Sequence, residues 1–214
     1  MDIKEHKKSF QLERIILFSD AVFAISITLL VIELKLPDIE EVTNSTLANA
    51  LLNTFPHFFS FVLSFMIIGI YWIAHHRMFN FVINYDNKLI WLNLLFLFFI
   101  VLMPFSSNIY GVYGGLNTAF SVYVFNISMI ALFNFLLYHY ISKPKKKLSH
   151  GLENPRLVKY YKIRTCIVPA CFGIGLIVSY CGSSGWVITL SRTSPLLIIV
   201  VMKILRRIFA DVAV

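Results

Sequence analysis

The sequence is poor in charged residues. Only 14% of its 214 residues are Asp, Glu, Lys or Arg, whereas a typical soluble domain has about 25%, and 58% are hydrophobic. Such a composition leaves too little polar surface for an ordinary water-soluble globular protein. Intrinsic disorder is excluded as well, because disordered chains have low hydrophobicity.

The sequence also has little that would support a disulfide framework, a metal centre or an enzyme active site. Its three cysteines, Cys166, Cys171 and Cys181, form no C-x-x-C pair and are expected to be inert buried thiols. His75 and His76 are adjacent but have no third ligand at zinc-type spacing. Phosphate-loop, dinucleotide-binding and nucleophile-elbow motifs are absent. We therefore expect no metal, no cofactor and no enzymatic activity.

What the sequence does contain is a set of six long apolar runs. They cover approximately residues 15–36, 51–74, 89–109, 116–141, 163–181 and 185–205. Each is long enough to cross a hydrocarbon core of ~30 Å as an α-helix, and the alternation typical of a membrane β-barrel is absent. The sequence therefore predicts an all-α polytopic membrane protein with six transmembrane helices, in which residues 1–214 form a single transmembrane domain.

The basic residues predict the orientation of these helices. The net charge is +8, and 17 of the 19 Lys and Arg residues fall on one side of a six-helix arrangement. They lie in the N-terminal segment before the first run, around the second loop, in the fourth loop and at the C-terminal end. Basic residues gather on the cytoplasmic side of membrane proteins, so both termini are expected to be cytoplasmic. The charge then indicates a multi-pass protein of the cell membrane and requires no nucleic-acid partner, although the lysine run after Ser142 also suits anionic lipid head groups.

Two features of the runs leave alternatives open. A cleavable signal peptide competes for the first run, but that run is too long, and an acidic stretch separates it from the triplet Ala48-Asn49-Ala50. Arg192 lies about seven residues inside the sixth run. Its side chain either reaches the outer interface, pairs inside the bundle, or shows that the run is misplaced.

The first run combines a buried acid with an apolar stripe. Asp20 lies about six residues inside the run, where a carboxylate is expensive unless it faces protein or water and has a partner. At 100° per residue, a row of apolar residues falls on roughly the opposite side. Such a stripe usually faces lipid or packs on other helices. Its members are Phe18, Val22, Ile25, Leu29, Ile32 and Leu36, with Thr28 beside them.

The end of the second run offers partners for Asp20. Trp72 and His76 share one helix face and lie near the same membrane surface as Asp20. The sequence predicts a polar cluster of Arg14, Ser19, Asp20, Trp72 and His76, in which Arg14 or a histidine satisfies Asp20.

The residues of this cluster that lie at the start of the first run belong to a longer motif. It reads Arg14-x-x-x-Phe18-Ser19-Asp20 and continues with Ala24, Ile25, Thr28, Leu29 and Leu30. The motif resembles the signature of the transmembrane protein 175 family in its short prokaryotic form, whose members are potassium channels unrelated in fold to the usual potassium channels. The Trp72–His76 element and the stretch from Asn93 to Pro104-Phe105 are also similar to the family. The resemblance covers the first three helices well and the last three only by length and topology.

The resemblance implies a homotetramer in which the first helices line a pore without a carbonyl filter. Carried over by position, the constriction consists of Ile25, Leu29 and Ile32, with Thr28 as a polar layer. The residues Arg14, Phe18, Ser19 and Asp20 of the motif then pack the first helix against its neighbours and do not form the filter. A ring of aliphatic side chains cannot replace the water of a cation, so moderate selectivity for potassium over sodium is expected.

Acidic residues follow the first run. Glu33, Asp38, Glu40 and Glu41 would concentrate cations at the outer mouth of a pore, and a plain solvated loop is the equally weighted alternative.

Two other functions remain open on this topology. One is a proton-permeable channel. The other is a secondary transporter, because Pro104, Pro169 and the pair Gly173 and Gly175 suit broken helices near the midplane.

Overall fold

The computed structural model describes residues 3–182 and 184–211, with side chains from residue 8 onward. Within these ranges six helical segments are long and apolar enough to cross a membrane, which confirms the predicted all-α fold with six transmembrane helices. The α-helices are α1 (Ile3–Ile32), α2 (Asn44–Phe79), α3 (Asn87–Val101), α4 (Met103–Tyr113), α5 (Asn117–Ile141), α6 (Pro155–Cys181), α7 (Gly185–Arg192) and α8 (Leu197–Ile208).

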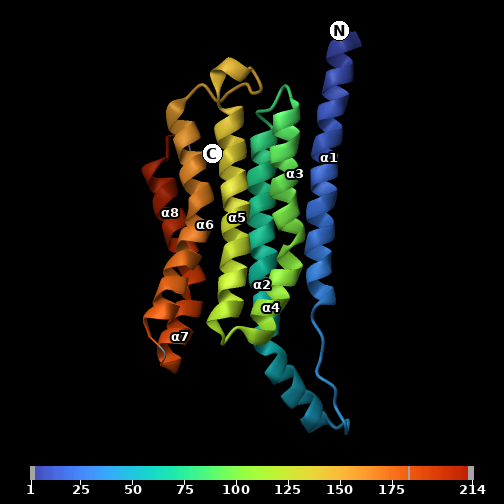
Figure 1. Ribbon diagram of the computed structural model, residues 1–214, viewed down its shortest axis with the longest axis vertical. Coiled ribbons are helices and arrows are strands. Elements are labelled where there is room, and N and C mark those ends of the chain that lie inside the picture. Colours follow the sequence, from blue (N-terminus) through green and yellow to red (C-terminus); the bar gives the residue numbers. More distant parts are fainter. Residues whose placement is uncertain (1–2, 183, 212–214) are drawn as a thin grey trace.

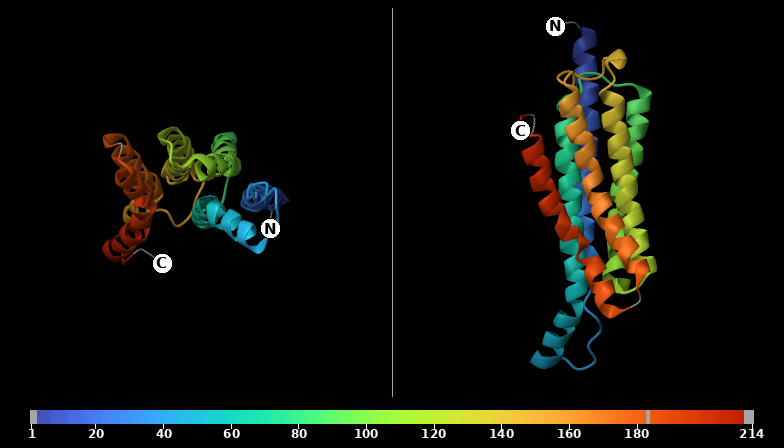
Figure 2. Two further views of the ribbon diagram at one scale, coloured as in Figure 1. Left: turned by 90° about the horizontal axis from the view of Figure 1, so that it is seen from below. Right: turned by 90° about the vertical axis from the view of Figure 1, so that its left-hand side faces the viewer.

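The helices form an elongated bundle with α1 at one edge. Helix α1 packs against α2, α3 and α4, helix α5 lies in the middle between α3 and α6, and α6 carries α7 and α8 at the other edge (Figures 1 and 2). The start of α1 and the end of α8 point toward the same end of the bundle. Because α1 is an edge helix, part of its surface has no neighbour among the described residues.

Helix α2 is longer than a membrane is thick. Its 36 residues span about 54 Å. It begins at a capping box, in which the Thr43 hydroxyl accepts from the Thr46 backbone and the Thr46 hydroxyl accepts from the Thr43 backbone. Pro56 lies inside the helix, and the first part of α2 turns away from the bundle (Figure 1). The predicted run of 51–74 therefore covered only the apolar part of a longer helix.

Prolines set two other boundaries differently from the prediction. The first helix ends at Ile32 rather than at residue 36, because Pro37 has no N–H to bond to the carbonyl of residue 33 and disfavours helical backbone at Leu36. Leu36 is therefore not part of a helical stripe. The third run is two helices in line that meet at Leu102, and Pro104 sits in the first turn of α4.

The sixth run is also interrupted, and the interruption accounts for Arg192. A short 3₁₀ turn, Ser194–Leu196, separates α7 from α8. The Arg192 Nε donates to the Gly114 carbonyl at 2.9 Å, one terminal nitrogen donates to the Ser179 Oγ at 3.2 Å, and the guanidinium lies 3.9 Å over the Phe120 ring. Arg192 thus pairs inside the bundle, which was one of the three placements left open.

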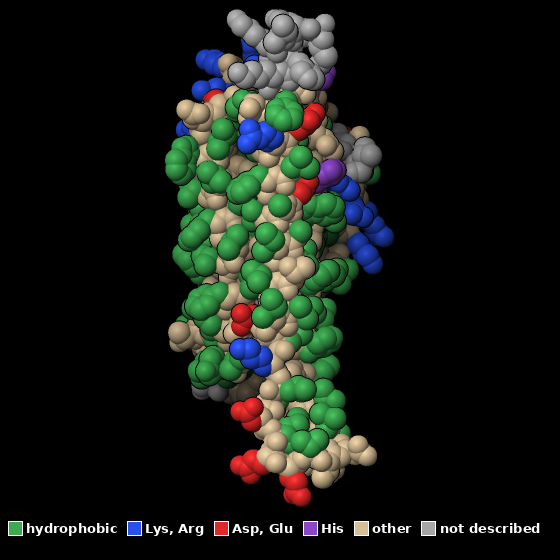
Figure 3. Space-filling view, turned by 90° about the vertical axis from the view of Figure 1, so that its right-hand side faces the viewer, with side chains coloured by type: hydrophobic (Ala, Val, Ile, Leu, Met, Phe, Trp, Pro, Cys, Tyr) green, Lys and Arg blue, Asp and Glu red, His purple; other side chains and the backbone are tan. Residues whose placement is uncertain are grey.

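The surface charges follow the arrangement of the helices. On the face that carries α1, most of the Lys and Arg side chains gather toward one end of the molecule, where acidic side chains also lie, and the other end is mainly acidic. Apolar side chains cover most of the length between them (Figure 3). This separation agrees with a bundle that crosses a membrane with its basic end in the cytoplasm.

Asp86 holds the turn between α2 and α3. Its Oδ1 accepts from the Leu89 backbone at 2.9 Å, which caps α3, and its Oδ2 accepts from the Tyr140 hydroxyl at 2.6 Å. Desolvation acts to raise the pKa of Asp86, but the hydrogen bonds from Tyr140 and Leu89 outweigh it and lower the pKa below its ordinary value.

We expect the substitution Asp86→Ala to lower the free energy of unfolding by about 1 kcal/mol, because α3 loses its cap. The pKa of Asp86 is lower in the folded protein than in the unfolded chain. The carboxylate therefore stabilises the fold fully at a pH above the unfolded-state pKa. This stabilisation is lost as the pH falls through the folded-state pKa. Thermal unfolding of the detergent-purified protein between about pH 7 and pH 3 tests this. Asp38→Ala, in an exposed loop, is the control. An unchanged acid response in the Asp86 variant would contradict the assignment.

Candidate functional site

One face of α1 is buried in the bundle. Ser19, Phe23, Ser26 and Leu30 are each at most 2% exposed. Their spacing of four, three and four residues keeps them on one side of the helix, which packs against α2, α3 and α4. This face fixes α1 to the rest of the chain.

The neighbouring face of α1 carries the predicted constriction residues and is uncovered. Ile25 is 58% exposed, Leu29 37% and Ile32 63%. Thr28 is exposed beside them, and its hydroxyl donates to the Ile25 carbonyl at 2.9 Å, so the hydroxyl oxygen remains free to accept. Phe18 of the motif lies on this side as well. Within one copy of the chain, this face is a strip of aliphatic side chains with one hydroxyl.

A chain of three hydrogen-bonded side chains joins α1 to α3 and α2. The Asn93 Nδ2 donates to the Ser19 Oγ at 2.9 Å, and the Asn93 Oδ1 lies 2.8 Å from the His75 Nε2. Ser19 donates in turn to the Ile15 carbonyl at 2.8 Å. Ser19, His75 and Asn93 are at most 2% exposed. Because the side-chain oxygen of Asn93 can only accept a hydrogen bond, His75 must carry a proton on Nε2.

A second polar contact lies one residue further along α1. The Trp72 Nε1 donates to the Asp20 Oδ1 at 2.9 Å. The Trp72 ring packs against His76, with 5.7 Å between the ring centroids. Asp20 is thus satisfied by an indole and not by Arg14 or a histidine. His76 is exposed, and the Arg14 guanidinium donates to the Gln11 side chain at 3.5 Å.

The structure therefore divides the predicted polar cluster. As expected, Ser19 and Asp20 bond to side chains of neighbouring helices, and Trp72 is the partner of Asp20. The buried histidine, however, is His75, and its partner is Asn93. The signal for His75 is present in the sequence, because the buried positions of α2 recur at three- and four-residue spacing and include Tyr71 and His75 but not His76.

His75 is held by aromatic packing and by its hydrogen bond to Asn93. Its ring stacks on Phe96 at 5.5 Å and lies 4.4 Å from Phe79. Among the side chains that the structure describes, no group of three His, Cys, Asp or Glu residues lies close enough together to hold a metal ion.

The acidic residues after α1 occupy two environments. Glu33 is half-buried and accepts from the Asn108 Nδ2 at 2.6 Å. Asp38, Glu40 and Glu41 are exposed in the loop that leads to α2. All four lie at the end of the bundle opposite most of the basic residues.

Sequence comparisons relate the first three membrane-spanning segments of this chain to known proteins. Residues 14–104 match the family model for TMEM175, described as an endosomal/lysosomal potassium channel. A protein of Chamaesiphon minutus named as a potassium channel is 38% identical over 130 residues, which are 59% of this chain and 64% of that protein. The human endosomal/lysosomal proton channel TMEM175 is 36% identical over 98 residues, 43% of this chain and 19% of that protein. The chain spans less than two thirds of the length of these curated relatives.

Solved structures extend the similarity to the whole bundle. The crystal structure of a lysosomal potassium-selective channel TMEM175 homologue from Chamaesiphon minutus matches with a TM-score of 0.73 and 27% identity, covering 88% of this chain and 95% of that one. The potassium channel MtTMEM175 matches in fold with a TM-score of 0.60 at 22% identity, covering 92% and 93%. The motif on α1 thus lies in a chain with the fold of these channels, and residues 14–104, which carry the motif, match the TMEM175 family model.

Proposed function

We propose that this chain forms a moderately selective potassium channel of the cell membrane, in which four copies place their α1 helices around a central pore. The observation that carries the proposal is the uncovered face of α1 with Ile25, Leu29 and Ile32. Two polar contacts on the other side of the helix hold that face in a fixed direction. The names of the bacterial relatives support a potassium channel.

The uncovered face suits association between copies. Lipid tails are as apolar as leucine, so helices associate in a membrane by close packing and not by the hydrophobic effect. Ala21 and Ala24 are exposed next to Thr28 on α1. Small residues of this kind let helix backbones approach closely, which brings the aliphatic side chains of several copies to one axis.

A ring of Ile25, Leu29 and Ile32 would select ions by the cost of removing their water. Aliphatic side chains offer no oxygen ligands, and a narrow apolar constriction gates by dewetting. Potassium is larger than sodium and holds its water less tightly, so it passes with the smaller cost. The free lone pairs of the Thr28 hydroxyl replace part of the lost hydration.

The acidic loop supports the cation preference at the outer mouth. Asp38, Glu40 and Glu41 are exposed and raise the local concentration of cations. Glu33 contributes less directly, because its carboxylate is bound to Asn108.

A proton-permeable channel is the second candidate, since the related proteins of Homo sapiens and Bos taurus are named as proton channels. A secondary transporter with the same topology is the third. Fluxes of potassium, sodium and protons through purified protein in liposomes distinguish the three. Large uncoupled potassium flux supports the channel, dominant proton flux favours the second candidate, and slow flux that requires a coupled gradient favours a transporter.

We expect Ile25→Asn to raise potassium flux and to reduce the preference for potassium over sodium, because a polar side chain wets the constriction. Lowering the barrier by ~1.4 kcal/mol corresponds to a roughly tenfold rise in flux. The matched control is Val31→Asn, which changes another exposed aliphatic residue of α1 that lies off the stripe. Unchanged flux through normally assembled Ile25→Asn protein, or an equal effect of Val31→Asn, would overturn the assignment of the pore.

We expect Asn93→Ala to destabilise the protein by about 1–2 kcal/mol, the upper part of the range for buried side-chain hydrogen bonds between membrane helices. The substitution leaves both Ser19 and His75 without their partner. Thermal unfolding in detergent measures the loss, and the exposed Asn80→Ala serves as the control. In a double-mutant cycle with Ser19→Ala, a coupling above ~0.5 kcal/mol is expected. Simple additivity would show that the two side chains act independently.

We expect Asp20→Ala to impair folding or tetramer assembly, whereas Asp20→Asn retains an oxygen that accepts from Trp72 and is tolerated better. Size-exclusion chromatography and cross-linking in detergent report assembly, and liposome flux reports conduction. Normal assembly and conduction in Asp20→Ala would mean that the contact with Trp72 has no structural role.

A further inference from the structure

Arg164 is a half-buried arginine on the side of α6 that faces α2. It is the tenth residue of α6, within one of the six candidate membrane spans. Its Nε is buried and has no hydrogen-bond partner, and both ion pairs found among the described residues involve other side chains. A guanidinium at such a position is costly unless another group satisfies and neutralises it.

Two more buried donors near Arg164 lack partners. The Tyr71 side chain is 2% exposed, and its hydroxyl has no hydrogen-bond partner. Asn134 is fully buried, its oxygen accepts from the Thr165 hydroxyl at 3.0 Å, and its Nδ2 has no partner. Tyr71, Arg164 and Asn134 belong to three different helices, α2, α6 and α5. Their unpaired groups can all donate hydrogen bonds, so the group that would satisfy them is an acceptor.

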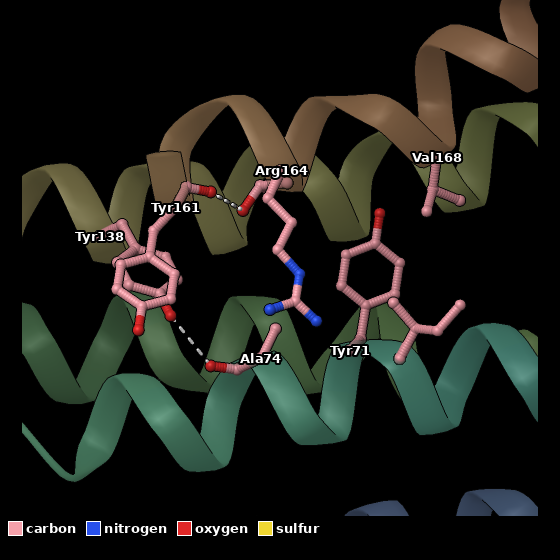
Figure 4. Close-up of a pocket in the computed structure, with 8 residues that line it drawn as sticks. Tyr71, Ala74, Tyr138, Tyr161, Arg164 and Val168 are labelled. Carbon is pink, nitrogen blue, oxygen red and sulfur yellow. Dashed lines mark hydrogen bonds between the residues drawn. The ribbon is translucent and has the colours of Figure 1, made fainter. Parts of the chain in front are cut away.

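A small cavity lies between these helices. Its volume is about 20 Å³, and Ile70, Tyr71, Ala74, Tyr138, Tyr161, Arg164, Thr165 and Val168 line it. Figure 4 shows the guanidinium reaching from α6 toward α2, between Ala74 and Tyr71, with the Tyr71 hydroxyl turned toward α6. A space of this size holds one water-sized species.

The hydroxyl groups of two residues beside the cavity already use their protons within the chain, and neither accepts from the Arg164 Nε. The Tyr138 hydroxyl donates to the Ala74 carbonyl at 3.1 Å, and the Thr165 hydroxyl donates to the Tyr161 carbonyl at 3.1 Å as well as to Asn134. Arg77, one turn beyond Ala74 on α2, adds a second positive charge on the same side of the bundle and also stands outside both ion pairs.

We propose that this cavity binds one small monovalent anion of the halide class, chloride in the cell, between the guanidinium of Arg164 and the hydroxyl of Tyr71. A bound water satisfies the donors but leaves the charge of Arg164 uncompensated inside the span. A halide accepts from the Arg164 Nε and the Tyr71 hydroxyl, the two unpaired donors whose residues line the cavity, and also neutralises the guanidinium. The bound anion then links α2 to α6 without entering the conduction pathway on α1.

Thermal unfolding of the purified protein, titrated from potassium gluconate to potassium chloride at constant ionic strength, tests the proposal. We expect the wild-type midpoint to rise with chloride and to saturate, and Arg164→Gln to lose this response. Lys159→Gln, at an exposed position on the same helix, is the matched control and keeps the wild-type response. An equal response in wild type and Arg164→Gln would overturn the proposal.

If Arg164→Gln fails to fold, Tyr71→Phe provides a second test of the site. The hydroxyl contributes one hydrogen bond to an anion, so its loss should shift the chloride midpoint of the stabilisation about tenfold. A wild-type chloride dependence in Tyr71→Phe would count against the site.

Crystals grown in bromide give the direct test. An anomalous bromide peak in the cavity between Tyr71 and Arg164 supports the proposal. A cavity that holds only an ordered water at saturating bromide overturns it.

Discussion

The direction in which α1 faces depends on one buried chain of hydrogen bonds, from Ser19 through Asn93 to His75. In a membrane an apolar helix gains little by choosing one apolar neighbour over another, because lipid and leucine are alike. A buried serine that must meet one amide removes this freedom. Rotation of α1 by a single residue, 100°, would break the contact and carry Ser19 away from α3. The apolar face with Ile25 is therefore held in place by polar atoms on a different face.

The difference between the buried face and the uncovered apolar face accounts for the composition of α1. Its buried face includes the small polar residues Ser19 and Ser26, whose hydroxyls also bond to the carbonyls of Ile15 and Val22 one turn earlier. Small side chains let α1 lie close to α2 and α3, and their hydroxyls are satisfied without water. The large aliphatic residues are left for the face that no part of the same chain covers.

The sequence was sufficient to predict the number of membrane-spanning segments and the apolar stripe on the first one. Both follow from the hydrophobicity of single segments of the chain. It was insufficient where the outcome depends on several helices at once. His75 and His76 are neighbours in sequence but point 100° apart, and the choice between them is made by the way α2 rotates against α3. The partner of His75, Asn93, lies on a third helix. The roles of Ile25 and the other stripe residues in a pore remain predictions, since they depend on further copies of the chain.

Two arginines inside predicted spans show how the same charge is accommodated in different ways. Arg192 donates to the Gly114 carbonyl and to Ser179 and lies over the Phe120 ring, so oxygen atoms and an aromatic face of this chain surround its guanidinium. Arg164 has an unpaired Nε beside the unpaired hydroxyl of Tyr71 and a cavity of about 20 Å³. The same bundle supplies bonded acceptors to Arg192, whereas no described acceptor bonds to the Nε of Arg164. Such a site is completed by an acceptor from outside the chain, and a halide supplies the charge as well as the hydrogen bonds.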